Sequence, residues 1–299
     1  MILLTGGNGF LGRYISNEIT TNSIEVRTLG RGTGNDIICD LSNDIPNLFD
    51  IYDAVIHCCG KAHVVPVTHL EEQSFFDVNV KGTRNLLESL DKLTSLPKSF
   101  LFISTVAVYG KAEGTLIDEK TELLASDPYG LSKIQAEYMI KEWCESRGVI
   151  YTIFRLPLIV GAQPPGNLRK MILGIKKGFY FNIGGGGARK SMVLATDVAK
   201  IIPKALTVGG VFNLTDRYHP SFSELSLVIS TQLGKKKPLS IPSWLAKIIA
   251  LIGDSLGEKF PLNSKKLTKI ESNLTFSDLN AVNTLGWKPK SIIKDFKIN

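Results

Sequence analysis

Short apolar runs alternate with longer stretches of helical spacing through the first half of the chain. Runs typical of buried strands cover residues 2–5, 24–29, 54–58, 99–104 and 150–155. Between them, helical patterns begin near Phe10, extend from about 72 to 93 and run from about 129 to 147, where Gly148 stands in the C-cap position. Strands separated by helices indicate βαβ units, so we expect an α/β fold built on a doubly wound parallel sheet.

The pattern loosens after Pro157 into segments rich in glycine and proline, such as GAQPPGN and IGGGGARKS. These segments predict loops and a smaller lobe built on the first part of the chain. The longest apolar run of this half covers residues 244–253, and Lys247 interrupts it. It is far shorter than the roughly 20 residues that cross a bilayer, so we expect a buried helix there.

Composition and charge indicate which classes of protein fit this sequence. Of the 299 residues, 43% are hydrophobic and 21% charged, as in a globular, enzyme-sized protein. The net charge of +7 comes partly from lysine clusters at 235–237 and around 265–269, but these lack the interleaved aromatic residues of nucleic-acid modules. We therefore expect no nucleic-acid partner, and an anionic small substrate would suit this charge.

Other features bear on location and metal binding. The opening MILLTGG leaves no room for an export leader, and the four cysteines form no CxxC pair, so we expect a cytoplasmic protein without a membrane partner. His57, His63 and His69 recur every six residues, which matches no common ligand spacing, so we expect no metal site.

A glycine-rich segment, TGGNGFLG, follows the first strand and opens the first helix. Glycines at these positions allow a tight turn, a close approach of the backbone to a pyrophosphate, and close packing of helix on strand. This Rossmann-type context predicts that a dinucleotide contacts the loop at Gly6, Asn8, Gly9, Phe10, Leu11 and Gly12. We therefore assign 1–160 to a dinucleotide-binding domain, to which 190–215 contributes, and 161–299 to an interleaved substrate-binding lobe.

The tip of the second strand bears on the choice of cofactor. It ends Leu29-Gly30-Arg31, without the acidic residue that binds the ribose of NAD. An arginine there favours the 2′-phosphate of NADP(H), although NAD(H) stays possible if Arg31 points into solvent and Gly30 only makes a turn. Asp40 and Leu41, after a short third strand, are expected near the adenine ring.

Two further segments carry candidate catalytic side chains. ISTVAVYG ends a strand with Ser104 and Thr105, at the edge of the sheet where ligands bind in such folds. DPYGLSK then sets Tyr129 and Lys133 four residues apart, on one face of a helix. An ammonium near a phenol favours the phenolate and lowers its pKa, so this pair could serve as an acid and base.

In this order, the motifs resemble the extended short-chain dehydrogenase/reductase family, and in particular its sugar-nucleotide epimerases, dehydratases and reductases. The similarity covers nearly the whole chain and includes TGGNGFLG, VIHCCGKAHV, VNVKGTRNLLE, STVAVYG, PYGLSK, RLPLIVG, KSMVLATDVA and LGWKP. Members of the family commonly form homodimers through two long helices, here near 72–93 and 129–147.

The resemblance implies roles for individual residues. Tyr129 would be the acid/base, Lys133 would hold the nicotinamide ribose and lower the tyrosine pKa, and Thr105 would hydrogen-bond the reacting sugar oxygen. Cys59 would lie beside the cofactor, and Asn79 would support the substrate site. Further substrate contacts are expected from Gln163, Asn167, Arg189 and Lys190, each of which could equally be a solvated loop residue.

Departures from the family narrow the expected reaction. Dehydratases follow the strand-end threonine with an Asp-Glu pair, whereas this chain has Val106 and Ala107, which cannot transfer a proton. Galactose epimerases typically carry an asparagine at the position of Leu158 and an acid at the tip of the second strand. We therefore expect NADPH-dependent reduction of a UDP-4-keto-hexose or N-acetylhexosamine, with UDP-hexose 4-epimerisation as the alternative. A non-catalytic NADP-binding or RNA-associated protein of the same fold is the rival of another class.

Overall fold

A seven-stranded parallel sheet forms the centre of the structure, a computed structural model that describes residues 1–62, 64–257, 260 and 262–298. The strand order is β11-β7-β5-β4-β1-β2-β3. The order reverses between β1 and β4, which confirms the doubly wound sheet predicted from the sequence. The strands are β1 (Ile2–Thr5), β2 (Val26–Gly30), β3 (Ile37–Ile38), β4 (Ala54–His57), β5 (Ser99–Thr105), β7 (Ile150–Leu156) and β11 (Gly210–Asn213).

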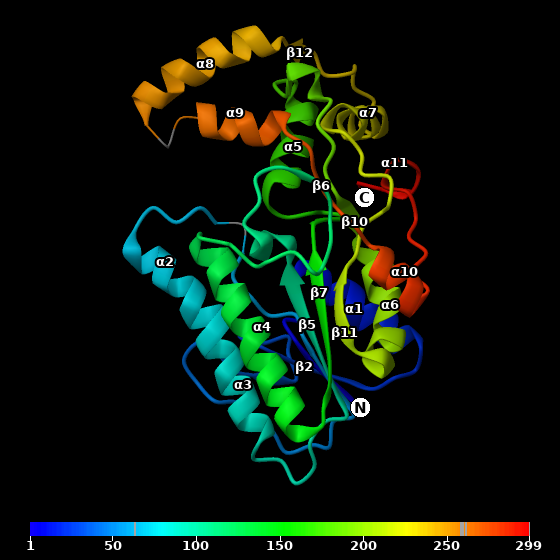
Figure 1. The fold of residues 1–299 in the computed structure, drawn as a ribbon. Helices are drawn as coiled ribbons and strands as arrows, with labels where there is room; N and C mark the ends of the chain where they lie inside the picture. The colour runs from blue at the N-terminus through cyan, green and yellow to red at the C-terminus, as the bar shows by residue number, and fades with distance from the viewer. Residues whose placement is uncertain (63, 258–259, 261, 299) are drawn as a thin grey trace.

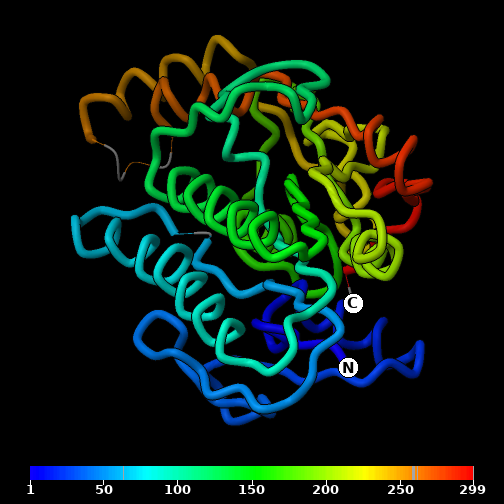
Figure 2. Tube along the Cα trace, turned by 60° about the horizontal axis from the view of Figure 1, so that its bottom comes forward, coloured from blue at the N-terminus to red at the C-terminus, as the bar shows by residue number. Residues whose placement is uncertain are grey.

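Helices cover both faces of this sheet (Figures 1 and 2). On one face, α1 (Phe10–Thr21) packs beside α6 (Ala195–Val208), and Ile15 and Ile202 belong to one buried cluster with strand residues. On the other face lie α2 (His69–Phe76), α3 (Gly82–Leu90) and α4 (Pro128–Arg147). Burial on both faces explains why the strands read as continuous apolar runs.

The helix expected over 72–93 is divided by a π-helical turn, η1 (Asp77–Lys81). It begins at His69 because Thr68 and Glu71 form a reciprocal capping box. The π-helical turn joins α2 to α3 without a break in the chain and contains the predicted site residue Asn79. Such turns are rare and frequent at functional sites.

Helix α4 has clear start and stop signals. The Asp127 side chain accepts a hydrogen bond from Gly130 N (3.0 Å), and Pro128 occupies the first turn. At the other end Gly148 adopts a left-handed conformation, with φ of 67°. The cap fixes the start of α4 at the first turn that carries Tyr129.

A smaller lobe lies above the carboxyl ends of the strands (Figure 1). Three two-stranded parallel pairs belong to it: β8 with β10, β9 with β12, and β6 with β13. Ala281, Leu285 and Trp287 of the C-terminal part return to the core beside α6. The remaining elements are η2 (Val106–Tyr109), β6 (Gly114–Ile117), β8 (Leu158–Val160), α5 (Gly166–Lys177), β9 (Asn182–Ile183), η3 (Gly184–Gly186), β10 (Met192–Leu194), α7 (Phe222–Gln232), β12 (Ser240–Ile241), α8 (Ser243–Leu256), α9 (Ser264–Glu271), β13 (Leu274–Phe276), α10 (Leu279–Leu285) and α11 (Ile292–Asp295).

The apolar run at 244–253 forms α8, and the expectation that this helix is buried is wrong. Its small residues Ala246, Ala250 and Gly253 face the lobe, whereas Trp244 and Leu251 are 64% and 65% exposed. A Cβ on Gly253 would lie 2.0 Å from the carbonyl oxygen of Leu262, so the small face packs too closely to admit larger side chains. Among the residues described, no helix has both the length and the apolar character needed to span a bilayer.

Candidate active site

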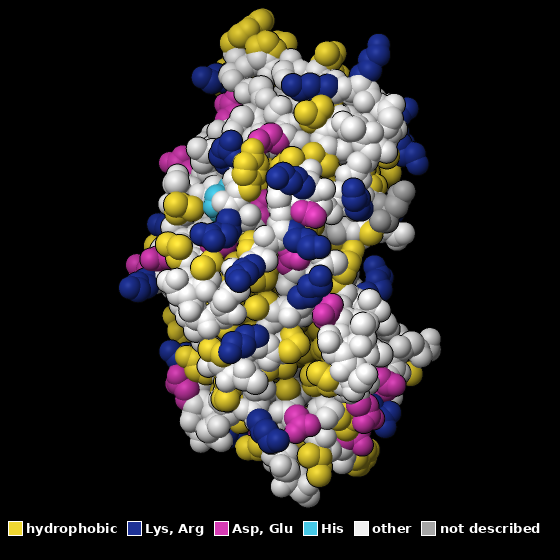
Figure 3. All heavy atoms as spheres, turned by 90° about the vertical axis from the view of Figure 1, so that its right-hand side faces the viewer, with side chains coloured by type: hydrophobic (Ala, Val, Ile, Leu, Met, Phe, Trp, Pro, Cys, Tyr) yellow, Lys and Arg dark blue, Asp and Glu magenta, His cyan; other side chains and the backbone are white. Residues whose placement is uncertain are grey.

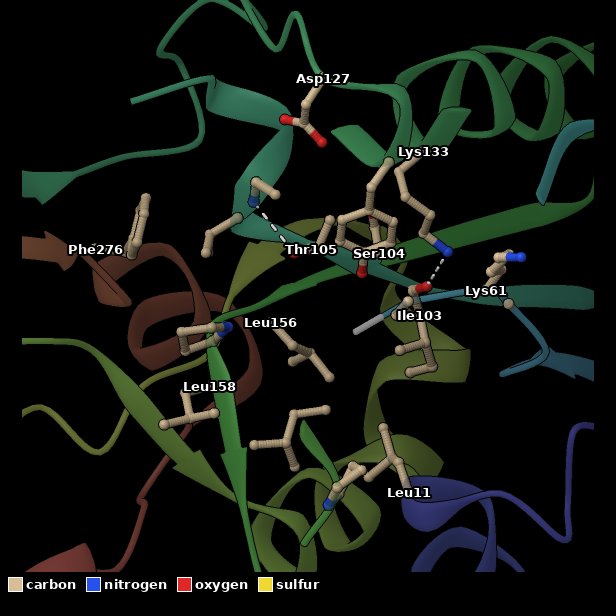
Figure 4. Close-up of a pocket in the computed structure, with 18 of the residues that line it drawn as sticks. Leu11, Lys61, Ile103, Ser104, Thr105, Asp127, Lys133, Leu156, Leu158 and Phe276 are labelled. Carbon is tan, nitrogen blue, oxygen red and sulfur yellow. Dashed lines mark hydrogen bonds between the residues drawn. The ribbon is translucent and has the colours of Figure 1, made fainter. Parts of the chain in front are cut away.

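A cavity of about 830 Å³ opens at the carboxyl ends of the central strands, between the sheet and the smaller lobe. Figure 4 shows Leu11 from α1 on one side and Asp127 on the other, with Thr105 and Lys133 between them. The cavity brings together eight of the residues predicted from the sequence to bind cofactor or act in catalysis: Gly9, Phe10, Leu11, Gly12, Cys59, Thr105, Tyr129 and Lys133.

The glycine loop leaves the start of α1 open to this cavity. A Cβ on Gly12 would lie 2.1 Å from the Gly6 oxygen, and one on Gly6 would lie 2.8 Å from Cys59 N, so the turn tolerates no side chain at either position. Gly9 caps the helix without a side-chain hydrogen bond, and the first turn contains no acidic residue. The first N–H groups of α1 are therefore suited to an anionic group such as a pyrophosphate.

At the tip of β2 the structure pairs two of the predicted cofactor residues. Arg31 Nη1 lies 3.9 Å from Asp40 Oδ2, and the arginine side chain is 76% exposed. Asn8 lies next to Gly34, in the loop that follows this tip. A Cβ added to Gly34 would lie 3.4 Å from Asn8 Nδ2. Leu41 is buried, and its carbonyl accepts a hydrogen bond from Asn85 Nδ2 (2.8 Å), so it contributes to packing.

Thr105 and Tyr129 meet on the wall of the cavity. Thr105 ends β5, and its hydroxyl accepts a hydrogen bond from Ala107 N (3.2 Å), which fixes the side chain at the start of η2. Tyr129 lies in the first turn of α4, with its ring 6.0 Å from that of Phe75. Burial raises the pKa of Tyr129, and a hydrogen bond with Thr105 opposes that shift. The structure thus differs from the expectation of an acidified phenol.

Lys133 explains this difference. Its Nζ donates a hydrogen bond to the carbonyl oxygen of Ile103 (2.7 Å; Figure 4). It also lies 3.9 Å from the centre of the Phe102 ring. Burial lowers the pKa of Lys133 to about 8, against the opposing effect of the Glu137 carboxylate one turn further along α4. In this arrangement the ammonium is held by the strand rather than by the tyrosine.

Asn79 is a buried residue that supports the site through hydrogen bonds to neighbouring segments. Its Oδ1 accepts a hydrogen bond from Lys61 N (2.7 Å), and its Nδ2 donates to Lys61 O (3.2 Å) and to Ser132 Oγ (2.9 Å). The side chain is 2% exposed. Because its amide is occupied by Lys61 and Ser132, Asn79 joins the loop after β4 to α4 and does not face a substrate.

The other predicted substrate residues are not among those that line the cavity. Arg189 Nη1 donates to His219 O (3.1 Å), and its guanidinium lies 5.3 Å from the centre of the Tyr218 ring. Lys190 Nζ donates to Lys269 O at the end of α9 (2.9 Å). Gln163 and Asn167 are exposed near the start of α5. The structure gives Arg189 and Lys190 roles in joining segments of the lobe, contrary to the expectation of substrate contacts.

Lysines that the sequence reasoning missed line the cavity instead. Lys265 and Lys269 lie one turn apart on α9, and Lys61 and Lys111 lie on loops after β4 and η2. The i, i+4 spacing of Lys265 and Lys269 was the available signal, because it places both ammonium groups on one helix face. Together they give the cavity a cationic side suited to an anionic substrate.

The positions that depart from the family pattern also face the cavity. Val106, Ala107 and Leu158 are among its lining residues, with Leu274 and Phe276 of the lobe. None of these side chains can accept or donate a proton. Acid/base chemistry at this part of the wall therefore depends on Thr105 and Tyr129.

A buried ion pair stands behind the catalytic side chains. Arg155 Nη2 lies 2.8 Å from Glu137 Oε2, and Ser104 Oγ also donates to Glu137. Arg155 Nη1 donates to the Tyr109 hydroxyl (3.2 Å), which donates in turn to Asn213 Oδ1 (2.8 Å). This network joins β5, α4, β7 and β11 directly beneath the cavity and holds the strand ends in register.

His57 and His69, the two of these histidines that the structure describes, lie in different surroundings. His57 is buried, its ring nitrogens lie 2.7 Å from Thr5 Oγ1 and 3.0 Å from Thr83 Oγ1, and burial lowers its pKa to about 3. His69 is an exposed residue at the start of α2, and His63 lies outside the described residues. The described part of the chain contains no cluster of three potential metal ligands.

Comparisons with known proteins place this site in a family. The model of the NAD dependent epimerase/dehydratase family matches residues 2–214. A "UDP-glucose 4-epimerase" of Vibrio cholerae is 28% identical over 98% of this chain and 92% of its own length. An "N-acetyl-alpha-D-glucosaminyl-diphospho-ditrans,octacis-undecaprenol 4-epimerase" of Escherichia coli O157:H7 is 30% identical over 71% of this chain and 66% of its own length.

Structural similarity extends over almost the whole chain. A UDP-glucose 4-epimerase from Thermotoga maritima, solved with UDP-glucose, has a TM-score of 0.74 and 19% identity, and covers 98% of this chain and 95% of its own. That likeness confirms the fold, and the matched family model spans the glycine loop, Thr105, Tyr129 and Lys133. The protein is an enzyme of the short-chain dehydrogenase/reductase type and belongs to the NAD dependent epimerase/dehydratase family.

Proposed function

We propose that this enzyme reduces the 4-keto group of a UDP-hexose or UDP-N-acetylhexosamine with NADPH. The observation that carries the proposal is the meeting of Thr105, Tyr129 and Lys133 in one cavity with the open start of α1. The glycine loop and α1 would hold the pyrophosphate, and Lys133 would hold the nicotinamide ribose. When bound, NADPH supplies the hydride.

The side chains of the protein account for the proton. Tyr129 gives its phenolic proton to the oxygen at C4 as the ketone becomes an alcohol, and the Thr105 hydroxyl donates a hydrogen bond to the same oxygen. The raised pKa of Tyr129 keeps the phenol protonated at neutral pH, which suits a general acid. At the positions of Val106 and Ala107, where dehydratases carry carboxyl groups after the strand-end threonine, no side chain can remove a proton beside the carbonyl.

The cationic side of the cavity supports a nucleoside diphosphate as the carrier of the sugar. Lys265 and Lys269 would bind the diphosphate from α9, and Lys111 would bind it from the loop after η2. These lysines replace Arg189 and Lys190 in the proposed substrate site. The Escherichia coli relative is named for a sugar carried on a polyprenyl diphosphate, so tests of substrate should include a lipid-linked sugar as well as a UDP-sugar.

Arg31 supports NADPH and net reduction. The tip of β2 presents an exposed guanidinium, which can bind a 2′-phosphate, and a cofactor consumed in each turnover must exchange. We expect Arg31→Glu to weaken NADPH binding and to strengthen NADH binding, because a carboxylate repels the phosphate and accepts hydrogen bonds from the ribose. Calorimetry with both cofactors measures this, and Arg84→Glu, an exposed arginine on α3, is the matched control.

4-Epimerisation is the second candidate, and the names of the relatives favour it. It would use the same three side chains, with Tyr129 first accepting the proton of the C4 hydroxyl and later returning it. It differs in its cofactor requirement, because an epimerase regenerates its cofactor within each turnover. The rival expectation of a non-catalytic NADP-binding or RNA-associated protein does not agree with membership of this enzyme family.

One experiment distinguishes reduction from epimerisation. In separate samples, the purified protein with NADPH is given a UDP-4-keto-6-deoxy-hexosamine or UDP-glucose, and NADPH absorbance is followed with the sugar products. Stoichiometric loss of NADPH with formation of a 4-hydroxy sugar supports reduction. Interconversion of UDP-glucose-type and UDP-galactose-type sugars without net loss of NADPH supports epimerisation. NADPH binding without turnover of either sugar overturns the proposal.

A further inference from the structure

One whole side of α8 is apolar and faces away from the protein. Trp244, Ile248, Leu251 and Ile252 lie within a narrow sector of the helix, and they are 64%, 48%, 65% and 54% exposed. A helix that packs on its protein normally turns such side chains inward. Here the inward sector holds Ala246, Ala250 and Gly253 together with the half-buried Ile249, so the exposed apolar side chains on the other side are available to a partner or a lipid surface.

Neighbouring loops extend this apolar face. β9 pairs with β12, and Asn182 N donates to Leu239 O (2.9 Å), which brings Phe181 next to Leu239. Phe179, Phe181 and Leu239 are 66%, 43% and 71% exposed. We call the α8 surface the set formed by Phe179, Phe181, Leu239, Trp244, Ile248, Leu251, Ile252 and Leu256.

Exposed lysines are close in sequence to the residues of the α8 surface. Lys247 lies on α8 itself, and two exposed runs adjoin the surface along the chain, Lys176 and Lys177 before Phe179, and 235–237 before Leu239. Figure 3 shows hydrophobic side chains at the top end of the molecule, the end that carries α8 in Figure 1, with lysine and arginine side chains beside them. The acid on α8, Asp254, is already engaged, since its carboxylate accepts hydrogen bonds from Ser264 N and Oγ.

We propose that the α8 surface docks on an anionic phospholipid bilayer. An exposed apolar helix face with a tryptophan and a border of lysines can enter the headgroup region while the ammonium groups contact lipid phosphates. A second copy of this chain is the poorer occupant, because self-association through this surface would bring the two lysine borders together. This peripheral contact differs from the expectation that the protein has no membrane partner.

Docking would also orient the active-site cavity. Helix α9 packs against α8, and its Lys265 and Lys269 line the cavity. The sheet lies at the opposite end of the molecule from α8 (Figure 1). A bilayer in contact with α8 would therefore lie near the part of the cavity that the smaller lobe forms. The part of the sheet proposed to bind the cofactor would stay in solvent.

Vesicle sedimentation tests the proposal with the full-length protein. We expect the wild type to pellet with vesicles of phosphatidylglycerol and phosphatidylcholine, to pellet far less with phosphatidylcholine alone, and to dissociate as salt is raised. Trp244 reports insertion directly, because Trp143 and Trp287 are 7% and 3% exposed. Its emission should shift to shorter wavelength when anionic vesicles are added, and Trp244→Phe should remove the shift.

Variants locate the contact. Ile248→Ser with Leu251→Ser should weaken vesicle binding by about tenfold or more, since both side chains would insert. Phe49→Ser, at a residue 80% exposed on the sheet domain, is the matched control and should bind as the wild type does. Lys236→Glu with Lys237→Glu should weaken binding similarly, whereas Lys92→Glu with Lys204→Glu, at exposed lysines elsewhere, should have a much smaller effect.

The remaining outcomes overturn the proposal. If the wild type does not bind anionic vesicles at low salt, the α8 surface has another partner. If both lysine pairs weaken binding equally, the attraction is general charge and not docking through α8. If the Ile248 and Leu251 changes leave vesicle binding intact but convert a dimer into a monomer in light scattering, the surface joins two copies. NADPH affinity and the melting temperature of each variant show that the fold is retained.

Discussion

Tyr129 is the residue on which the chemistry depends. Burial keeps its phenol protonated, and its hydrogen bond with Thr105 orients it. We expect Tyr129→Phe to lower kcat by at least roughly 10²-fold, the usual effect of losing a positioned acid or base, with little change in NADPH affinity. Steady-state kinetics and calorimetry measure the two effects. Tyr138→Phe, at an exposed tyrosine on the same helix, should be silent, and full activity in Tyr129→Phe would contradict the assignment.

The burial of Lys133 predicts how the stability of the protein changes with pH. Burial depresses its pKa to about 8 from the ordinary lysine value of 10.5, so between these values the folded state holds fewer protons than the unfolded state. Stability contributed by this group is therefore fully present above the unfolded pKa and is lost as pH falls through the folded pKa. Relative to Lys133→Met, the wild type should gain unfolding free energy from pH 8 to pH 10.5.

Urea denaturation at a series of pH values measures that difference. Lys141→Met, at an exposed lysine on the same helix, should show no such gain and serves as the control. A pH-independent difference between the wild type and Lys133→Met would mean that the lysine is not desolvated as the structure indicates.

At the scale of elements, the loop between β1 and α1 is the part of the site that sequence predicts best. The structure of this loop is determined locally. Its own glycines set the turn and allow Gly6 to lie close to Cys59 N. We expect Gly12→Ala to cost about 1 to 3 kcal/mol and to weaken dinucleotide binding, since its Cβ would lie 2.1 Å from the Gly6 oxygen. Thermal unfolding and NADPH titration measure both effects.

Gly187→Ala is the matched change. A Cβ there meets no atom within 4 Å, and φ is −75°, so stability and NADPH affinity should stay at wild-type values. If Gly12→Ala behaved like Gly187→Ala, the close packing of the glycine loop would not be needed for cofactor binding.

The smaller lobe was harder to predict, for a physical reason. The sheet strands and α4 follow from apolar periodicity and from caps such as Asp127 and Gly148, which act within a few residues. By contrast, which lysines face the cavity depends on how α9 packs on distant segments, so Arg189 and Lys190 were expected where Lys265 and Lys269 lie. The apolar run of α8 was expected inside because apolar residues favour burial, but only its small residues and Ile249 pack against the lobe, and the other large side chains are exposed.

For the whole molecule, the open question is how copies of the chain meet. Helices α2, α3 and α4 form a continuous layer over one face of the sheet (Figure 2). Leu70 on α2 and Tyr138 on α4 are exposed by 82% and 61% on this layer. A shallow hollow of about 300 Å³ between α3 and α4, lined in part by Trp143 and Arg147, lies on the same layer. These features agree with the family pattern of dimers formed through two long helices.

We expect the protein to be a homodimer joined through this layer, and Leu70→Asp with Tyr138→Asp to convert it into a monomer. Two carboxylates would have to lose their water at the contact without a partner of opposite charge, which opposes association. Light scattering over a range of concentrations measures the mass, and Leu251→Ser on α8 is the control that should remain dimeric. A wild type that is monomeric at every concentration, or a dimer that survives both aspartates, would show that this helix layer faces solvent.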